Sequence, residues 1–303
     1  MCVNPKFGFL VTDSFRSGLI KRSVHFCTKE HYLYMLENVD IYKNEYHSEP
    51  MTFPCGRCPE CCMEHADAWA YRIMNEASQY DDNCFITLTY ANTDNVNYDN
   101  ASLQKKDVQD FVKRLRERIR RASGKKIRFF CCGEYGEKKQ RPHYHIIIFG
   151  WKPNDLKYFK TINKHIVYTS EFVRDVWKWG FITVSEVELE TALYSALYMQ
   201  KLLPKQVGKS EPFLLMSTNP GIGYNFLINN IDNLILTDKI IVNGHTCKLP
   251  RYYLRVLEDK LLLDTSTLRK NRSIKSELAA SSLDFSGKIE IYKKLYNWFI
   301  PDT

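Results

Sequence analysis

The fold of this chain is decided by the stretch Arg141-Pro-His-Tyr-His-Ile-Ile-Ile-Phe149. Pro142 has no N–H to give to a sheet, so it marks the beginning of a strand. The β-branched and aromatic residues that follow without a break predict a strand covered on both faces. Because side chains alternate along a strand, His143 and His145 project from one face, two residues apart. This spacing is typical of two imidazoles that bind one metal ion.

Two histidines do not complete a metal site, so we expect a carboxylate from the preceding strand, predicted over residues 127–132. That strand runs into a loop over residues 133–141 that begins Gly133-Glu-Tyr-Gly-Glu137. Glu134, at the strand end, is the first choice for the third ligand, and Glu137 is the alternative. Such a set leaves coordination positions open for a phosphate oxygen, which suits Mg²⁺ or Mn²⁺. The competing interpretation is a core histidine with satisfied hydrogen bonds.

Two tyrosines follow in Thr191-Ala-Leu-Tyr-Ser-Ala-Leu-Tyr-Met-Gln-Lys201, which we interpret as a helix. Tyr194 and Tyr198 are four residues apart and share one side of it. A phenol with a pKa of about 10 is a poor nucleophile unless a base, a cation or a metal-activated substrate assists it. Lys201, on roughly the same side, could neutralise the developing charge. The tyrosines alone would suggest packing, but the upstream histidine pair favours a catalytic role.

The net charge of +8 is concentrated in the middle of the chain. Residues 105–126 hold ten Lys or Arg against three Asp or Glu. This density favours binding to a polyanion, most commonly nucleic acid, although a solvated helix face would look the same. The candidate DNA-binding residues are Lys113, Arg114, Arg116, Arg120, Arg121 and, next to the histidines, Arg141.

The ten cysteines include a cluster in the sequence Cys55-Gly-Arg-Cys58-Pro-Glu-Cys61-Cys62. A Cys-x-x-Cys turn presents two thiolates to one Zn²⁺, and Cys61 extends the set to three. The preferred fourth ligand is Cys2, and the alternatives are Cys27, His65 and Cys62. Such a closed site would be structural and would join the N-terminal segment to the following helix. The competing interpretation is a turn with reduced thiols.

The remaining composition predicts a soluble, globular protein. Of the 303 residues 44% are hydrophobic, and no apolar run approaches the roughly 18 residues that a membrane-spanning helix needs. The N-terminus lacks the pattern of a signal peptide, so disulfides are not expected. Gly208-Lys-Ser210 resembles the end of a phosphate-binding loop, but Leu203 stands where its first glycine should be. We therefore predict neither an ATPase nor a helicase.

The hydrophobic periodicity predicts an α+β fold in which helices pack on an antiparallel sheet. Residues 1–65 form a cysteine-rich segment that we expect to be irregular, residues 66–205 the core, and residues 206–303 a mostly helical region. The expected helices cover residues 66–77, 108–119, 172–177 and 191–201. The expected strands cover residues 84–90, 127–132, 143–149 and 181–185.

With these residues identified, the chain resembles the replication initiators of small single-stranded DNA phages, the Microviridae, most closely the gokushovirus type. These proteins are rolling-circle endonucleases of the HUH class, and the resemblance covers much of residues 1–225. The order and spacing of several short stretches support it together. They are Met1-Cys-Val-Asn-Pro5, Pro54-Cys-Gly-Arg-Cys58, Trp69-Ala-Tyr-Arg72, Phe85-Ile-Thr-Leu-Thr-Tyr90, Phe111-Val-Lys-Arg-Leu-Arg116, Gly133-Glu-Tyr-Gly-Glu137, Arg141-Pro-His-Tyr-His145 and Met216-Ser-Thr-Asn-Pro-Gly-Ile-Gly223.

The resemblance implies an HUH nuclease-like core with His143 and His145 as the metal pair. It also implies Tyr194 and Tyr198 as nucleophiles, with Lys201 as the accompanying lysine. The protein would nick single-stranded DNA at the phage origin, form a 5′-phosphotyrosine link and rejoin the strand. It would act in the cytoplasm of the bacterial host, away from membranes, together with the host helicase and polymerase. This sequence departs from the family pattern at Leu197, where a basic residue usually precedes the second tyrosine.

Three alternatives compete with this interpretation. A non-catalytic, zinc-containing DNA-binding protein would use the histidines structurally. A metal-dependent phosphodiesterase would keep the ion and need no tyrosine nucleophile. A relaxase or transposase of the same HUH class would share the chemistry, but the matches in the N-terminal stretches favour the phage proteins.

Overall fold

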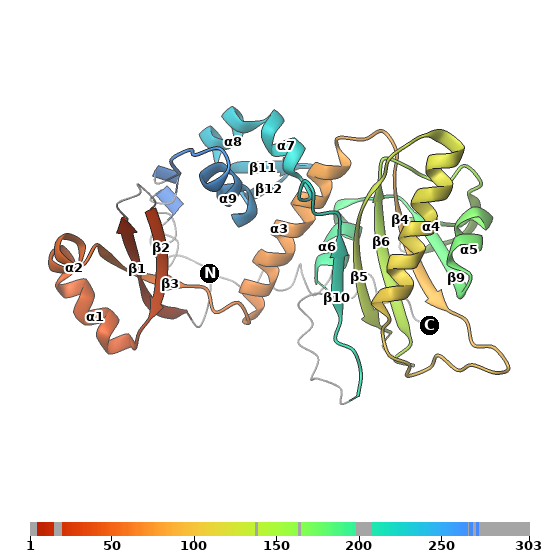
Figure 1. Ribbon diagram of the computed structural model, residues 1–303, viewed down its shortest axis with the longest axis horizontal. Helices are drawn as coiled ribbons and strands as arrows, with labels where there is room; N and C mark the ends of the chain where they lie inside the picture. The colour runs from red at the N-terminus through yellow and green to blue at the C-terminus, as the bar shows by residue number, and fades with distance from the viewer. Residues whose placement is uncertain are drawn as a thin grey trace. The chain divides into compact units, whose positions relative to one another are not determined.

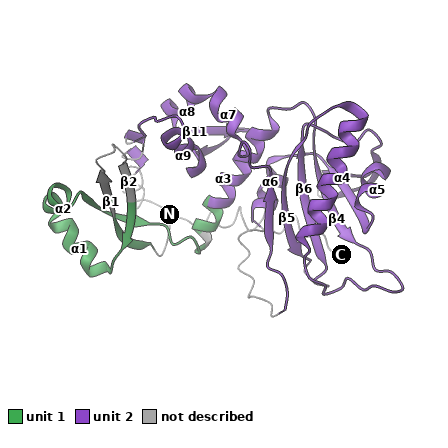
Figure 2. Ribbon diagram, viewed as in Figure 1, with its two compact units in different colours: residues 1–64 green, residues 65–303 purple. Residues whose placement is uncertain are grey.

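The structure is a computed structural model that describes residues 5–14, 20–136, 139–162, 165–197, 208–265, 267–268 and 271–272. The chain forms two compact units, residues 1–64 and residues 65–303 (Figure 2). In the described part of the chain, no helix is both long and apolar enough to cross a membrane.

The first unit is built on a three-stranded antiparallel sheet in the order β2-β1-β3, joined by two short helices. Its elements are β1 (Lys6–Ser14), β2 (Ile20–Phe26), α1 (Lys29–Glu37), α2 (Val39–Glu45) and β3 (Ser48–Phe53). The expectation of an irregular segment was therefore wrong. The pairing of β1 with β3 is distant in sequence, with Lys6 opposite Phe53, and local periodicity does not reveal such a partner.

The second unit contains a seven-stranded antiparallel sheet in the order β10-β5-β6-β4-β9-β8-β7 (Figure 1). With helices packed on it, this sheet confirms the α+β prediction. The strands are β4 (Asn83–Tyr90), β5 (Arg128–Tyr135), β6 (Pro142–Phe149), β7 (Lys157–Ile162), β8 (His165–Thr169), β9 (Gly180–Ser185) and β10 (Phe213–Met216).

Helices cover both faces of this sheet and divide the core into two layers. One layer holds Tyr144, Ile146 and Ile148 of β6 with residues of α4 (Lys105–Ser123) and α5 (Glu171–Trp177). The opposite layer holds Ile147 and Phe149 with residues of α3 (Pro59–Ala77) and α6 (Leu189–Leu197). Because β6 is covered on both faces, it is apolar almost throughout, as its sequence predicted.

The chain after β10 packs as a third cluster on α3, around Tyr71 and Tyr253. Its elements are α7 (Tyr224–Asn229), α8 (Ile231–Thr237), β11 (Lys239–Val242), β12 (His245–Lys248) and α9 (Arg251–Asp259). The region expected to be mostly helical thus also holds a two-stranded hairpin. Its first strand, β10, belongs to the main sheet, where it pairs with β5.

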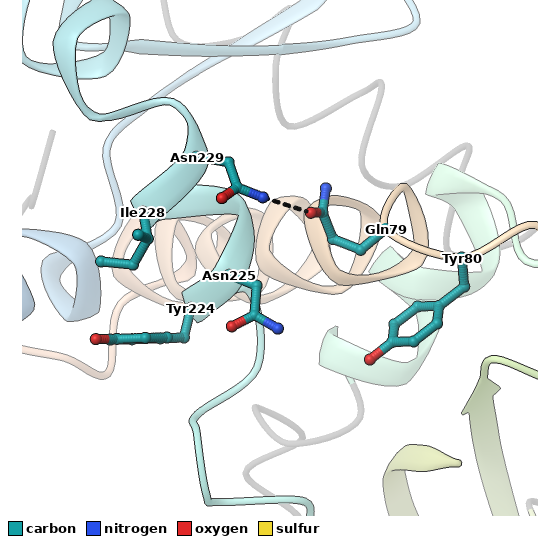
Figure 3. A pocket seen from close by; sticks show the side chains of 6 residues that line it. All are labelled: Gln79, Tyr80, Tyr224, Asn225, Ile228 and Asn229. Carbon is teal, nitrogen blue, oxygen red and sulfur yellow. Dashed lines mark hydrogen bonds between the residues drawn. The ribbon is translucent and has the colours of Figure 1, made fainter. Parts of the chain in front are cut away.

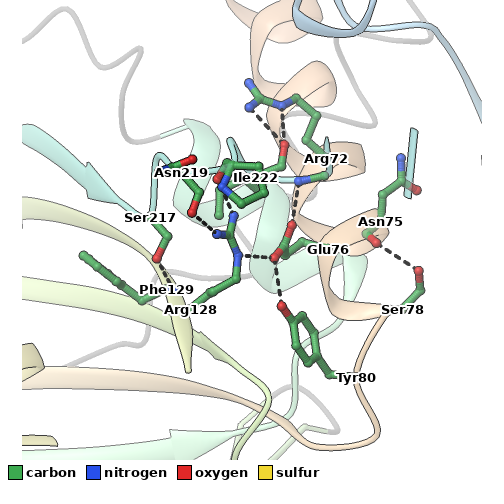
Figure 4. Close-up of polar contacts among 12 residues, drawn as sticks. Arg72, Asn75, Glu76, Ser78, Tyr80, Arg128, Phe129, Ser217, Asn219 and Ile222 are labelled. Carbon is green, nitrogen blue, oxygen red and sulfur yellow. Dashed lines mark hydrogen bonds and ion pairs between the residues drawn. The ribbon is translucent and has the colours of Figure 1, made fainter. Parts of the chain in front are cut away.

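A buried ion pair joins α3, β5 and the segment before α7 (Figure 4). Glu76, whose residue is 2% exposed, accepts from Arg128 Nε at 2.6 Å and from the Gly223 N–H at 2.7 Å. The Arg128 guanidinium also donates to the Pro220 carbonyl at 2.7 Å. Nearby, Arg72 donates to the Ile222 carbonyl, and burial lowers its pKa to about 10.

Replacing Glu76 by glutamine should destabilise the second unit by about 3 kcal/mol. The substitution leaves the Arg128 cation buried without its counter-charge, and breaking a buried pair in this way typically costs about 3–5 kcal/mol. Urea unfolding followed by circular dichroism measures the effect. The matched control is Glu117→Gln on α4, whose pairs with Arg120 and Arg121 are exposed and contribute little. Equal midpoints for both variants would contradict the prediction.

Candidate active site

Strand pairing brings the three predicted metal ligands to one face of the sheet. Glu134 of β5 lies directly opposite His143 of β6, and His145 lies opposite Thr87 of β4. Because alternate residues share a face, Glu134, His143 and His145 all point towards the layer of α3 and α6. Glu134 stands within β5, which continues through Gly133, where the sequence predicted a loop. An added Cβ at Gly133 would stand 2.8 Å from the Phe213 ring, so glycine admits β10 at this position.

His145 is buried and held on both ring nitrogens. Its Nε2 lies 2.8 Å from Glu134 Oε1, and its Nδ1 lies 3.1 Å from Thr87 Oγ1. The Phe85 ring stacks on the imidazole, with centroids 5.6 Å apart. Two neighbouring ligands of an octahedral Mg²⁺ are about 3 Å apart, so Glu134 and His145 fit the donor set of a divalent ion. Thr87 fixes the ring as outer-shell partners of metal-binding histidines do.

His143 is prepared as a ligand but points elsewhere. Its Nδ1 lies 2.9 Å from the Pro142 carbonyl, which can only accept, so the proton sits there and Nε2 carries a lone pair. Burial lowers the pKa of His143, and the charges of His145 and Arg141 add to this, against the opposing carbonyl contact. The ring is therefore neutral near pH 7. The three ligand groups do not all come within 4.8 Å, so a shared ion requires the His143 ring to turn.

Tyr194 reaches this group from α6. At the start of this helix, Thr191 Oγ1 accepts from the Glu188 N–H at 2.9 Å, one half of a capping box. One turn later the Tyr194 ring meets the His145 ring edge to face, with centroids 5.1 Å apart. Its hydroxyl lies 3.5 Å from Glu134 Oε1, at the outer limit of a hydrogen bond. Residues from β5, β6 and α6, distant in sequence, thus converge on one carboxylate.

Several predicted site residues lie outside the described residues. They are the second tyrosine, the accompanying lysine, the alternative carboxylate and the preferred fourth zinc ligand: Tyr198, Lys201, Glu137 and Cys2. Their roles stay predictions.

The basic residues of α4 lie on the opposite side of the sheet from the histidines, as Figure 1 shows for the helix. Arg114 donates to the Val176 carbonyl at 3.1 Å and so holds α5. Arg116 lies over the Phe129 ring, 5.2 Å from its centroid, and donates to Ser217 Oγ at 3.3 Å. Any DNA contact by α4 would therefore be made away from the histidine face.

The other predicted DNA contacts have mixed surroundings. Lys113 is exposed, whereas Arg120 and Arg121 are exposed but pair with Glu117. Arg141 binds the Asp99 carboxylate through two nitrogens, at 2.9 and 2.5 Å, and donates to the Tyr90 carbonyl. This arrangement anchors the start of β6 and accounts for Arg141 without DNA.

Thr87 and Phe85 were not among the predicted site residues. The strand prediction over residues 84–90 was confirmed, and its alternation places both side chains on one face. The sequence does not say that β4 pairs with β6, which is what brings these residues to His145. Only the pairing identifies them.

The first unit holds a separate group of thiols that could bind a metal such as zinc. The sulfur atoms of Cys55, Cys58 and Cys61 all lie within 4.8 Å of one another, and those of Cys55 and Cys61 are 3.9 Å apart. Tetrahedral Zn–S bonds of about 2.3 Å place two sulfurs about 3.8 Å apart. The N–H groups of Arg57 and Cys58 both point at Cys55 Sγ, which favours its thiolate. Within the described residues, Cys27 and Cys62 do not join this group.

We expect purified protein to contain about one Zn²⁺ per chain, with three thiolates already close enough to share it. Cys58→Ser should lower the bound zinc to near background and lower the melting temperature, because binding energy is folding energy at such sites. Elemental analysis of dialysed protein measures the first effect. Cys247→Ser in the second unit is the control and should keep its zinc. Wild-type protein with well under one Zn²⁺ per chain would contradict the prediction.

Comparison with known proteins now complements this geometry. Residues 83–203 match the family model of the ORF2-type replication-associated proteins. The chain is 35% identical over 210 residues to the replication-associated protein VP4 of Bdellovibrio phage phiMH2K, an alignment that covers 66% of each chain. It is 29% identical over 226 residues to the replication-associated protein ORF4 of Chlamydia phage 1, covering 70% of this chain and 55% of that relative.

A third relative, the replication-associated protein ORF2 of Spiroplasma virus 4, is 28% identical over 242 residues, covering 74% of this chain and 75% of its own. The chain therefore spans only about two thirds of the Bdellovibrio phage protein and about half of the Chlamydia phage protein. No solved structure gives a significant match. The family match contains Glu134, both histidines and Tyr194.

Proposed function

Because the chain belongs to the ORF2-type family of replication-associated proteins of small single-stranded DNA phages, we propose that it is the endonuclease that starts and ends rolling-circle replication. In this proposal it cuts one strand of the phage origin, stays attached through a 5′-phosphotyrosine and later rejoins the strand. The observation that carries the proposal is the meeting of Tyr194, His145 and Glu134 at one carboxylate oxygen.

The nucleophile in this proposal is a tyrosine hydroxyl. Tyr194 attacks the scissile phosphorus, a bond forms between its oxygen and the phosphorus, and the bond to the 3′ oxygen of the DNA breaks. The phenolic proton is lost and the departing 3′ oxygen gains one. Glu134 lies on the side of the hydroxyl and can accept the proton. The reverse reaction, attack by a 3′ hydroxyl on the phosphotyrosine, reseals the strand.

Glu134, His143 and His145 would hold the divalent ion, Mg²⁺ or Mn²⁺. When bound, it would withdraw electron density from the phosphate and ease attack by a weak nucleophile. Phe85, stacked on one side of His145, and Tyr194, against its ring, shield the imidazole and fix its direction. The Thr87 hydroxyl at Nδ1 sets which nitrogen faces Glu134.

The proposal extends to the residues around this centre. Tyr198 would be the second nucleophile, so that one tyrosine holds a DNA end while the other attacks, with Lys201 neutralising charge. The basic residues of α4 would bind phosphates of a flanking DNA segment on the far side of the sheet, so binding should weaken steeply with salt. The Cys55, Cys58 and Cys61 group would bind Zn²⁺ and stiffen the first unit. Host proteins would supply unwinding and synthesis.

The test is to mix the protein with single-stranded phage DNA in Mn²⁺ or in chelator. We expect a covalent protein–DNA species that resists denaturing electrophoresis in Mn²⁺ and is absent with chelator. DNA binding without any adduct would instead support a non-catalytic DNA-binding protein. Cut DNA without an adduct would support a phosphodiesterase that uses water.

A further inference from the structure

The second unit has a pocket of about 340 Å³ where the end of α3 meets α7, away from the histidines. Figure 3 shows the six side chains that line it: Gln79, Tyr80, Tyr224, Asn225, Ile228 and Asn229. None carries a charge, three are carboxamides and two are tyrosines. A volume of this size falls within the roughly 300–1,000 Å³ that small-ligand sites occupy.

The pocket lies towards the far end of β6 from His143. Tyr80 stacks on Phe149, the last residue of that strand, with ring centroids 6.5 Å apart. His143 is the second residue of the same strand. At about 3.3 Å per residue, six steps along β6 separate the two ends by about 20 Å. The pocket is therefore distinct from the candidate active site but lies within the same unit.

The carboxamides are arranged to leave hydrogen-bonding capacity at the pocket mouth. Asn229 Nδ2 donates to Gln79 Oε1 at 3.2 Å, which fixes both amides relative to each other. The exposed Asn225 carboxamide makes no hydrogen bond with any other residue that the structure describes. A carboxamide offers a donor and an acceptor side by side, the pattern with which Asn and Gln recognise the edge of a base.

The walls of the pocket are pinned by the buried pair described above. Tyr80 donates to Glu76 at 3.3 Å, and Glu76 also accepts from the N–H of Gly223, which precedes α7 (Figure 4). The pocket is thus preorganised, which reduces the entropy lost when a ligand binds.

Positive charge surrounds the neutral pocket. Lys260 Nζ lies 5.2 Å from the centroid of the Tyr224 ring. Arg128 donates to the Asn219 and Pro220 carbonyls in the segment that leads into α7. Arg116, a predicted DNA contact, donates to Ser217 at the start of that segment. An uncharged, partly aromatic pocket with cations at its rim is the combination that binds an unpaired base and its flanking phosphates.

We propose that this pocket binds one unstacked nucleobase of the single-stranded DNA substrate. The ring of Tyr224 would provide the stacking face, and the Asn225 carboxamide would recognise the base edge. The inference rests on the proposed function, because it takes single-stranded DNA as the ligand. A second grip about 20 Å from the scissile phosphate would fix the direction and register of the strand across the unit.

The test measures affinity in protein whose chemistry is disabled by Tyr194→Phe and Tyr198→Phe. Binding of a short, fluorescein-labelled oligodeoxynucleotide of mixed sequence is followed by anisotropy. Tyr224→Ala and Asn225→Ala should each weaken binding about tenfold, the loss expected for one base contact. Tyr224→Phe should retain affinity, because it keeps the ring. The control Asn233→Ala lies on α8 and should bind as before.

A second measurement does not depend on how the alanine variants fold. An oligodeoxynucleotide containing 5-iododeoxyuridine is bound to the same protein, irradiated and digested, and the crosslinked peptides are sequenced. We expect crosslinks on the peptide that contains Tyr224. Crosslinks only elsewhere, or alanine variants that bind within about twofold of the parent, would overturn the proposal. Because the assay uses binding alone, a failure to form the covalent adduct would refute the nuclease and leave this result standing.

Discussion

Replacing both Tyr194 and Tyr198 with phenylalanine is expected to abolish the covalent protein–DNA adduct while leaving DNA binding nearly unchanged. Phenylalanine keeps the ring that packs edge to face on His145 and removes only the hydroxyl beside Glu134. Without a nucleophilic oxygen the covalent step has no route, so we expect a loss of at least about 10³-fold, as when other covalent enzymes lose their nucleophile. Gel analysis with labelled origin DNA measures the adduct.

The control for this pair is Tyr158→Phe on β7, an exposed tyrosine on the strand at the edge of the sheet. It should form as much adduct as wild type. Testing the two active-site substitutions singly then separates their roles, since only the residue that attacks first is needed for the first cut. Undiminished cleavage by the double variant would eliminate the tyrosine mechanism and favour a water-using phosphodiesterase.

Glu134→Gln is expected to have the second largest effect, a loss of at least about 10²-fold in cleavage. The amide has the shape of the carboxylate but not its charge, so it binds a divalent cation poorly and cannot accept the phenolic proton. Its removal therefore withdraws several kcal/mol of charge stabilisation. We expect a higher Mn²⁺ concentration to restore part of the activity, because weakened metal binding is one component of the loss.

The matched control is Glu188→Gln, a carboxylate that also pairs with a histidine, His165, but lies at the start of α6. It should retain most of the activity. Titration of Mn²⁺ with each variant separates affinity from rate. A Glu134→Gln enzyme with unchanged rate and unchanged Mn²⁺ dependence would show that this carboxylate serves neither the metal nor the nucleophile.

The core of the fold could be predicted because its signals are local. The apolar stripe from Val108 to Ile119 lies buried in α4, and the helix ends at Gly124, which adopts a left-handed conformation as expected. The run after Pro142 forms β6 and is covered on both faces. In each case a short stretch of sequence contains both the periodicity and the residue that ends it.

Other features depend on pairing between distant segments and could not be predicted locally. The sheet of the first unit needs β1 to find β3, and the site needs β4 and β5 to flank β6. Strands β7 and β8 were missed because β7 is an exposed edge strand with little apolar alternation. Likewise, no pattern in α4 reveals that its basic residues lie on the face opposite the histidines, since topology decides that.

The candidate site shows the same division. The spacing of His143 and His145 and the position of Glu134 near a strand end follow from alternation, which the structure bears out as a shared face. The direction of the His143 ring, towards its own Pro142 carbonyl, follows from local packing and could not be foreseen. The contact between His145 and Tyr194 depends on where α6 crosses the sheet.

The central claim is that a tyrosine of α6 and the carboxylate–histidine group of β5 and β6 act on one phosphate. Its most direct test is sequencing of the peptide that carries DNA after reaction with origin oligonucleotide and Mn²⁺. The account predicts a nucleotide joined to Tyr194 or Tyr198, with no linked peptide from the Glu134→Gln protein at low Mn²⁺. A nucleotide joined to any other residue, or cut DNA with no linked peptide, would contradict it.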